Sequence, residues 1–180
     1  ATGVLTLSGS ATVAQYQAAL RSITFSSSSE DPAVNAASRT ISFSVTDGQA
    51  ASTAAVAQVA VATINDAPTL TAIDDAVPIS EDQGPQFLQL TGISAGPESQ
   101  TVTVTAISEH PNLIANPSVT STAQAGTRLL TYSSQPNASG TAIIRVIVTD
   151  SGGVGGGGIN SVTNSFSVKV EAENDAPTIS

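Results

Sequence analysis

Apolar and polar residues alternate along this chain in several short runs, which is the pattern of β-strands with one buried face. In "RTISFSV", Ile41, Phe43 and Val45 share one face, and "QTVTVTA" and "NSFSVKV" repeat the arrangement. The run "AIIRVIVTD" is apolar on both faces, as expected of a strand in the centre of a sheet. These runs are rich in Val, Ile, Thr and Ser, so the pattern predicts an all-β protein of antiparallel strands.

One segment departs from this alternation. The sequence "ATVAQYQAALRSITF" places Val13, Tyr16, Gln17 and Leu20 at helical spacing. Thr12 precedes them and can accept hydrogen bonds from the first turn as an N-cap. We therefore expect one or two helical turns between strands.

A sequence repeat divides the chain into units. The pentapeptide "NDAPT" occurs at Asn65–Thr69 and at Asn174–Thr178, each time after an alternating run. Upstream, strands end at Asp47 and Asp150, which are 103 positions apart, whereas the two pentapeptides are 109 apart. The difference is absorbed by "DSGGVGGGGIN", which we interpret as a flexible hairpin loop that tolerates insertion. The repeated order predicts tandem antiparallel β-sandwiches of about 100 residues each.

The two units are not equally complete. Residues 69–175 hold enough candidate strands for a whole sandwich, and residues 1–66 hold about four. We divide the chain into the C-terminal part of one repeat (1–66), a complete repeat (67–175) and the start of the next linker or repeat (176–180). The early strands of the first, truncated unit either were left out or are supplied by a neighbouring molecule.

Composition excludes several classes of function. The net charge is -9, and the five Lys and Arg residues form no run, so we expect no binding of nucleic acid. The chain has no Cys, which excludes disulfides and thiolate metal sites. It has no apolar stretch of about 18 residues, so we expect no membrane insertion. An acidic surface of this kind favours solubility or the capture of cations.

Strand direction predicts where the acidic residues gather. In a sandwich of seven alternating strands, the turn between the last two strands lies at the N-terminal end of the domain. Asp150 occupies that turn, and Glu98 lies in another turn at the same end, so both should face Asn65 and Asp66 of the preceding linker.

The first unit should add Glu30 and Asp31 from "SSSSEDPAVN", which the same reasoning places at its C-terminal end. Calcium takes six to eight oxygen ligands at about 2.3–2.6 Å, and all of these side chains offer oxygen. The predicted Ca²⁺ ligands at the junction are Glu30, Asp31, Asn65, Asp66, Glu98 and Asp150.

A second group is predicted at the far end of the complete repeat, where Glu81 and Asp82 would meet Asn174 and Asp175, with Asn137 nearby. Each of these motifs also has an ordinary interpretation. Asp-Gly after a strand is a common turn. Asn-Asp-x-Pro can simply close a linker, and Glu-Asp between strands can protect a sheet edge.

Two longer stretches resemble a known family. "LSGSATVAQYQAALRSITF…RTISFSVTDGQ…INDAP" and "ISEDQGPQFLQLTGISAGPESQTVTVTAIS…NASGTAIIRVIVTDSGG…ENDAP" resemble the cadherin-like repeats of large bacterial surface proteins and adhesins. The resemblance implies Ig-like sandwiches, an extracellular or cell-surface location, and calcium at domain junctions that stiffens the rod. This sequence keeps the N-D-x-P linker but lacks the fuller run of alternating acids at cadherin junctions.

The expected function is therefore a calcium-stiffened structural or adhesive repeat, a stalk or filament segment whose partners are neighbouring repeats of the same chain. We do not expect an enzyme, because His110 is the only histidine and Asp74–Asp75 would need to face each other across a cleft. Two alternatives remain. One is a carbohydrate-binding module for a surface glycan, with Tyr132 as the candidate aromatic. The other is a filament subunit that exchanges strands with copies of itself.

Overall fold

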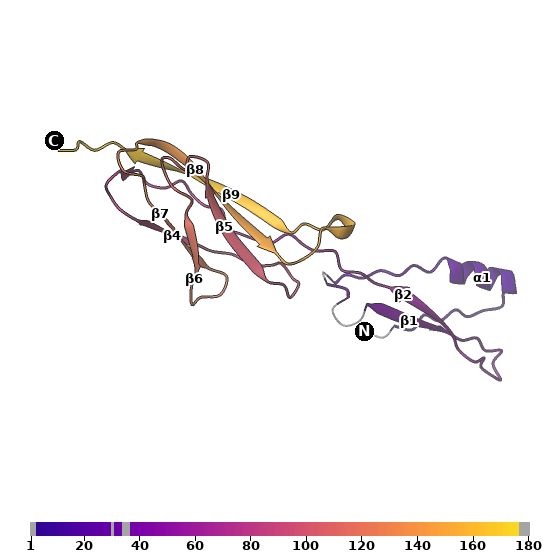
Figure 1. Ribbon diagram of the computed structural model, residues 1–180. Coiled ribbons are helices and arrows are strands. Elements are labelled where there is room, and N and C mark those ends of the chain that lie inside the picture. The colour runs from indigo at the N-terminus through magenta and orange to yellow at the C-terminus, as the bar shows by residue number, and fades with distance from the viewer. Residues whose placement is uncertain (1–2, 30, 34–36, 177–180) are drawn as a thin grey trace.

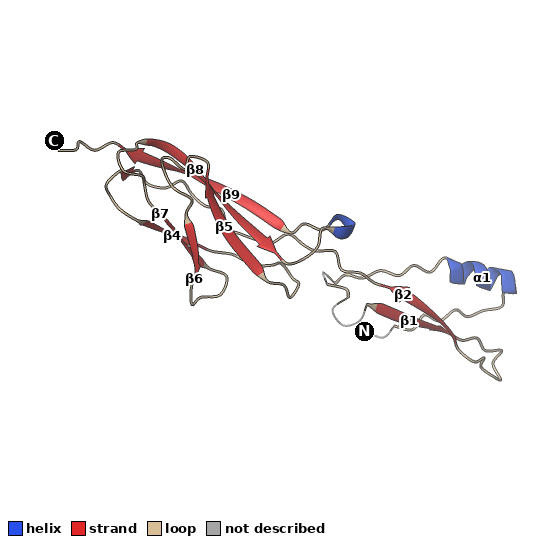
Figure 2. Ribbon diagram, in the orientation of Figure 1, coloured by secondary structure: helices blue, strands red, loops and turns tan. Residues whose placement is uncertain are grey.

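The computed structural model describes residues 3–29, 31–33 and 37–176, and the described residues are mostly β-strand. Figures 1 and 2 show two units that follow each other end to end, with the linker between them. The first contains α1, β1 and β2, and the second contains β3 to β9. The fold is all-β, as predicted. In the described part of the chain, no helix is long and apolar enough to cross a membrane.

The second unit is a sandwich of two sheets. One sheet has the order β3-β9-β8-β5 and the other has the order β4-β7-β6. All pairs are antiparallel except the short pairing of β3 with β9, which is parallel. The strands are β3 Ile79–Ser80, β4 Gln86–Leu90, β5 Val102–Ser108, β6 Ser118–Ser121, β7 Arg128–Tyr132, β8 Gly140–Asp150 and β9 Ser161–Glu171.

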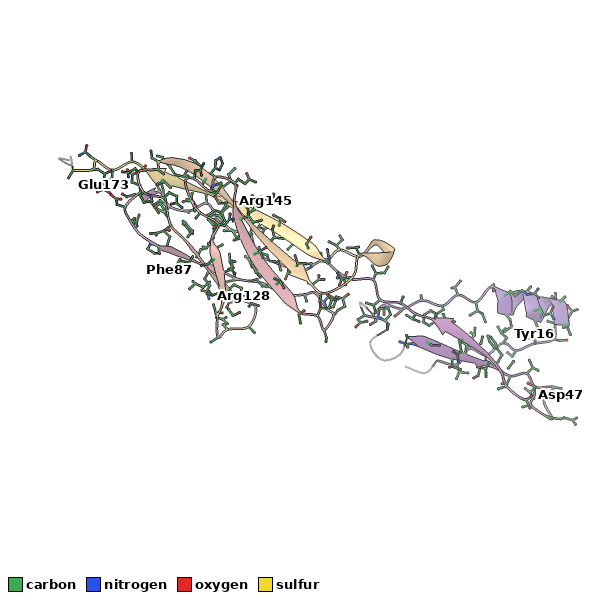
Figure 3. All side chains as sticks on the ribbon, viewed as in Figure 1. Tyr16, Asp47, Phe87, Arg128, Arg145 and Glu173 are labelled. Atoms are coloured by element: carbon green, nitrogen blue, oxygen red, sulfur yellow. The ribbon has the colours of Figure 1, made fainter. Side chains whose placement is uncertain are left out.

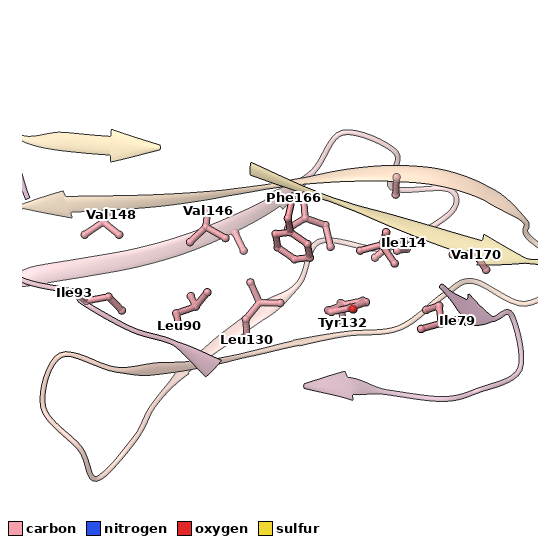
Figure 4. Close-up of a cluster of buried hydrophobic side chains, with 14 residues drawn as sticks. Ile79, Leu90, Ile93, Ile114, Leu130, Tyr132, Val146, Val148, Phe166 and Val170 are labelled. Atoms are coloured by element: carbon pink, nitrogen blue, oxygen red, sulfur yellow. The ribbon is translucent and has the colours of Figure 1, made fainter. Parts of the chain in front are cut away.

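The core lies between these two sheets (Figure 4). Every second residue of β8 points inward, so that Val146 and Val148 are fully buried. In Figure 4 they lie across the core from Ile93, Leu90 and Leu130. Tyr132 of β7 lies below Phe166, with 6.1 Å between the two ring centres. Burying one large apolar side chain contributes about 1.5–3 kcal/mol. β8 lies between β9 and β5, the central position that its apolar residues on both faces predict.

The chain that leads from the linker to β3 runs alongside β9. The side-chain amide of Asn164 donates to the carbonyl of Thr71 at 3.2 Å. The backbone amide of Ala76 donates to the carbonyl of Ser167 at 2.9 Å. Asp75 Oδ1 accepts from the Ser167 amide at 2.7 Å, and this hydrogen bond holds the pKa of Asp75 below its usual value. Side-chain and backbone bonds thus extend the parallel β3–β9 pairing toward the linker.

The described residues of the first unit form a helix and one hairpin. Helix α1 spans Val13–Arg21, and the antiparallel strands β1 and β2 span Ser38–Phe43 and Ala55–Ala60. Thr12 caps the helix in a reciprocal capping box with Gln15, so the predicted cap is confirmed. The helix has nine residues, slightly more than the one or two turns expected.

No residue described between 3 and 64 is buried, in contrast to the second unit. Val13, Val45 and Val56 are 74%, 69% and 60% exposed. The described part of the first unit therefore has no hydrophobic core of its own. The boundaries 1–66, 67–175 and 176–180 stay a prediction.

Candidate functional site

Asn65 of the linker is held by three segments of the second unit. Its side-chain Nδ2 donates to Asp150 Oδ1 at 3.2 Å, at the end of β8, and to the carbonyl of Ile159 at 2.6 Å. Its Oδ1 accepts from Gln100 Nε2 at 2.5 Å. The backbone carbonyl of Asn65 also accepts from the Ile159 amide at 3.1 Å. One linker residue is thereby joined to β8, to the glycine-rich loop and to the chain entering β5.

Two glycines of the loop make room for Asn65. A Cβ on Gly152 would lie 1.9 Å from Asn65 Oδ1, and a Cβ on Gly158 would lie 3.1 Å from Asn65 Cβ. Any larger residue at position 152 must therefore displace the asparagine side chain. The two ends of the loop between β8 and β9, at Gly152 and Ile159, thus fit closely around the linker, whereas nothing lies within 4 Å of a Cβ placed at Gly155 or Gly157. We call Asn65, Gln100, Asp150, Gly152 and Ile159 the linker socket.

Glu98 contacts the linker one residue further on. Its Oε1 accepts from the backbone amide of Asp66 at 3.2 Å. Its Oε2 is buried without a hydrogen-bond partner, as is Gln100 Oε1. Gly96 lies against the same carboxylate, because a Cβ there would be 3.1 Å from Glu98 Oε2. The junction thus contains two buried oxygen atoms whose hydrogen-bonding capacity is unused.

The structure brings together four of the six residues predicted at this junction. Asn65, Asp66, Glu98 and Asp150 meet at the N-terminal end of the second unit, as the direction of the strands predicts. Asp31 is engaged nearby, where its Oδ1 accepts from Thr63 Oγ1 at 2.6 Å.

Glu30 lies outside the described residues. Among the residues that are described, no three His, Asp or Glu side chains lie close enough together to hold a metal ion. The junction is closed by hydrogen bonds to Asn65, and its carboxylates do not form a preformed cage.

Sequence reasoning missed three members of the linker socket, Gln100, Gly152 and Ile159. Gln100 lies two positions after Glu98 in the same turn, and this spacing was the only available signal. Ile159 contributes backbone atoms, for which the identity of the side chain gives no signal. The glycine at position 152 was read as a sign of flexibility, although here it is required by close contact.

The opposite end of the second unit carries the other predicted group. Glu81 is buried, and its Oε1 accepts from the Glu173 amide at 2.9 Å. The pKa of Asp82 is raised above its usual value, first by loss of hydration and then by the charges of Asp175, Glu81 and Glu173. Ser80 Oγ donates to the carboxylate of Glu173. Glu173 was missed, although it immediately precedes the second N-D-A-P motif.

Asn174 does not join this group through any contact that the structure shows. Its amide donates to the carbonyl of the adjacent Asp175 at 3.2 Å, which is a local interaction. Asp47 lies at the distal end of the first unit (Figure 3). There its Oδ1 accepts from the amides of Gln49 and Ala50, both at 2.9 Å, and these bonds lower its pKa. For Asp47 the ordinary turn interpretation accounts for every contact shown.

The structure also places the residues that were considered for sugar binding or catalysis. Tyr132 is only 8% exposed and packs in the core, so it offers no open aromatic platform for a sugar. Phe87 is exposed (Figure 3). It lines a hollow of about 420 Å³ together with Asp74, Asp75 and the small accessible part of Tyr132. His110 Nδ1 accepts from the Ile143 amide at 3.4 Å.

Known proteins show only a weak structural similarity to this chain. No family model matches the chain, and no curated protein matches it either. Among solved structures, the chain is similar to domains 4 and 5 of the S-layer protein SbsC, with 16% sequence identity and a TM-score of 0.36. The similarity covers 73% of this chain and 65% of the S-layer chain, so the chain spans less than two thirds of that structure. Structural similarity at this level supports no conclusion about function.

Proposed function

We propose that this chain is a structural segment of an extracellular or cell-surface protein, in which tandem β-sandwiches form a stalk or filament and Ca²⁺ stiffens the junction between them. The observation that carries the proposal is the attachment of Asn65 to three segments of the following sandwich. No catalytic step is part of the proposed role.

The attachment limits how the linker can turn. A free linker rotates about two backbone bonds per residue, and every hydrogen bond to the second unit removes part of that freedom. Asn65 is fixed through both its side chain and its carbonyl, Asp66 through its amide, and Pro68 is buried with a fixed φ. The linker therefore leaves the second unit in a defined direction, which is the property that a rigid array of repeats requires.

The chemistry of the junction suits a hard cation. Asn65, Asp66, Glu98 and Asp150 all carry side-chain oxygens. One of the Glu98 oxygens is buried without a hydrogen-bond partner, as is Gln100 Oε1. The Asn65 amide now donates to Asp150, but a half-turn of this amide would present Oδ1 at the same place. Such a turn would break the hydrogen bonds of the Asn65 amide with the Ile159 carbonyl and with Gln100 Nε2, so bound Ca²⁺ would have to replace them. The linker and the second unit would then share a set of oxygen ligands.

A calcium titration tests this proposal. We expect calorimetry to show heat of Ca²⁺ binding for the wild type and weaker binding for Asp66→Ala. Asn65→Asp should destabilise the calcium-free protein, because it brings a second carboxylate to Asp150, and should tighten calcium binding. Asp74→Ala is a matched control, since it removes an exposed acidic residue away from the junction.

The stiffening is measured separately from the binding. Small-angle scattering with Ca²⁺ and with EDTA should show a narrower distribution of maximum dimensions when calcium is present. If neither wild type nor Asn65→Asp binds calcium, the junction is held by hydrogen bonds alone and the calcium part of the proposal is wrong.

The carbohydrate-binding alternative has less support, because Tyr132 is buried in the core. A glycan array with the whole chain is the direct check. Binding that is lost in Phe87→Ala would favour this alternative over a purely structural role.

A further inference from the structure

The first unit repeats strands whose surroundings are known from the second. The sequence "RSITFSS" at 21–27 matches "RLLTYSS" at 128–134, which contains β7. The sequence "ISFSVTD" at 41–47 corresponds in the same way to residues 144–150 of β8. Each of β1 and β8 is then followed by an antiparallel partner, β2 or β9, that leads to an N-D-A-P motif. The hairpin β1–β2 is therefore the counterpart of β8–β9.

Equivalent positions of the two hairpins differ sharply in burial. Val146 and Val148 are 0% exposed in the second unit. Their counterparts Phe43 and Val45 are 37% and 69% exposed. The two sets of residues have the same alternation and the same position relative to the Asp-bearing turn, so the side chains themselves do not explain the difference.

Residues 21–27, the counterpart of β7, are likewise more exposed than β7 itself. Leu130 is 0% exposed and Tyr132 is 8% exposed, whereas Ile23 and Phe25 are 44% and 49% exposed. The first unit therefore presents an apolar face on both of its layers. We call this face, formed by Ile23, Phe25, Ile41, Phe43 and Val45, the open core face.

The second unit shows what covers such a face. Residues 69–108 supply β3, β4 and β5, of which β5 pairs with β8 and β4 pairs with β7. This segment contributes Leu90, Ile93 and Ala106 to the core. In the described part of the first unit, β1 pairs with β2 alone, and no strands correspond to β3, β4 and β5. A two-stranded sheet with one uncovered apolar face is only marginally stable in water.

We propose that the open core face is the docking surface for a β-strand segment of this repeat type, with the strand pattern of residues 69–108. Such a segment would add a strand at the free edge of β1, as β5 does on β8, and lay a second strand against the segment around Phe25, as β4 does on β7. The alternation in "QTVTVTA" matches that of β1, so apolar side chains of both strands would point to the same side.

Two arms of one experiment test the docking. In the first, a peptide of residues 69–108 is added to the full chain. In the second, residues 67–117 are duplicated ahead of residue 1 in a single polypeptide. Amide hydrogen exchange is followed at 38–43 and 55–60, and we expect it to slow by at least about tenfold in either arm.

Two variants distinguish specific docking at the open core face from nonspecific hydrophobic association. Val45→Asp should abolish the protection, and because Val45 is exposed, this variant should leave the second unit folded. Ser42→Asp places the same charge on the opposite face of β1 and should leave the protection intact.

Unchanged exchange in both arms would overturn the proposal. So would a dimer of the chain, seen by light scattering, that buries Phe43 and persists when the peptide is added, because a second copy would then be the occupant.

Discussion

Replacing Gly152 by alanine tests how closely the linker is fitted to the second unit. The new Cβ would lie 1.9 Å from Asn65 Oδ1 and 2.7 Å from Gln100 Oε1, distances far below van der Waals contact. The backbone at Gly152 accommodates other residues, since its φ is outside the left-handed region. The cost of the substitution should therefore come from expulsion of the Asn65 side chain.

The size of the effect follows from the bonds that are lost. Asn65 makes two side-chain hydrogen bonds to neutral partners, each worth about 1 kcal/mol, and one bond that is shared between both oxygens of the Asp150 carboxylate, worth about 1.5–3 kcal/mol in total. The bond to Asp150 is long, and Asp150 keeps its bond from the Gly152 amide at 2.8 Å. We therefore expect Gly152→Ala and Asn65→Ala each to cost about 2–4 kcal/mol.

Urea unfolding of both single variants and of the double variant measures this cost. Because both substitutions remove the same hydrogen bonds, the double variant should be little worse than either single one, with a coupling energy of at least about 1.5 kcal/mol. Gly155→Ala is the control, since nothing lies within 4 Å of its Cβ, and it should be neutral or slightly stabilising. Additive effects, or a Gly152→Ala variant as stable as wild type, would refute the fitted socket.

Further predictions concern the core and the pH dependence. Leu130→Ala should cost about 2–5 kcal/mol by urea unfolding, because the residue is fully buried, whereas its counterpart Ile23→Ala should cost less than about 1 kcal/mol. Asp75 has a lowered pKa, so its ionised form stabilises the fold at neutral pH, and this stabilisation is lost as the pH falls through that pKa. Asp82 has a raised pKa, so its ionised form destabilises the fold, and the destabilisation disappears as the pH falls through that pKa toward 3.8. Thermal unfolding at pH 7 should therefore show Asp75→Asn less stable and Asp82→Asn more stable than wild type. The Asp82 difference should disappear as the pH falls toward 3.8, and the Asp75 difference should persist to lower pH before it disappears; changes of the same sign at pH 7 would contradict this assignment.

Much of the fold could be predicted, because a strand with one buried face shows alternating apolar and polar residues in the sequence. The alternation at Ile41 and Phe43 predicted β1, and the apolar residues on both faces of β8 predicted its central place in the sheet. The two-residue β3 is too short to show any period. Its parallel pairing with β9 depends on the path of the chain in space, and the alternation of apolar and polar residues carries no information about that path.

Part of the candidate site could be predicted from strand direction, and part of it could not. Glu98 and Asp150 could be placed beside the linker because strand direction alone decides the end at which each turn lies. The role of Asn65 could not be predicted, since it depends on three segments that meet in space. The shape of the glycine-rich loop could not be predicted either, because glycine occurs both in flexible loops and where two backbone segments approach each other closely.

The parallel course of the linker segment along β9 has a mechanical consequence. The chain enters the second unit at Asn65 and leaves it after Glu171, at opposite ends of two segments that run in the same direction. A force that pulls these two points apart slides the segments past each other. The contacts of Asn65 with Ile159, of Ala76 with Ser167 and of β3 with β9 are then loaded in shear, all at once. Separation requires breaking them together, so this arrangement resists extension more strongly than a hairpin opened one bond at a time.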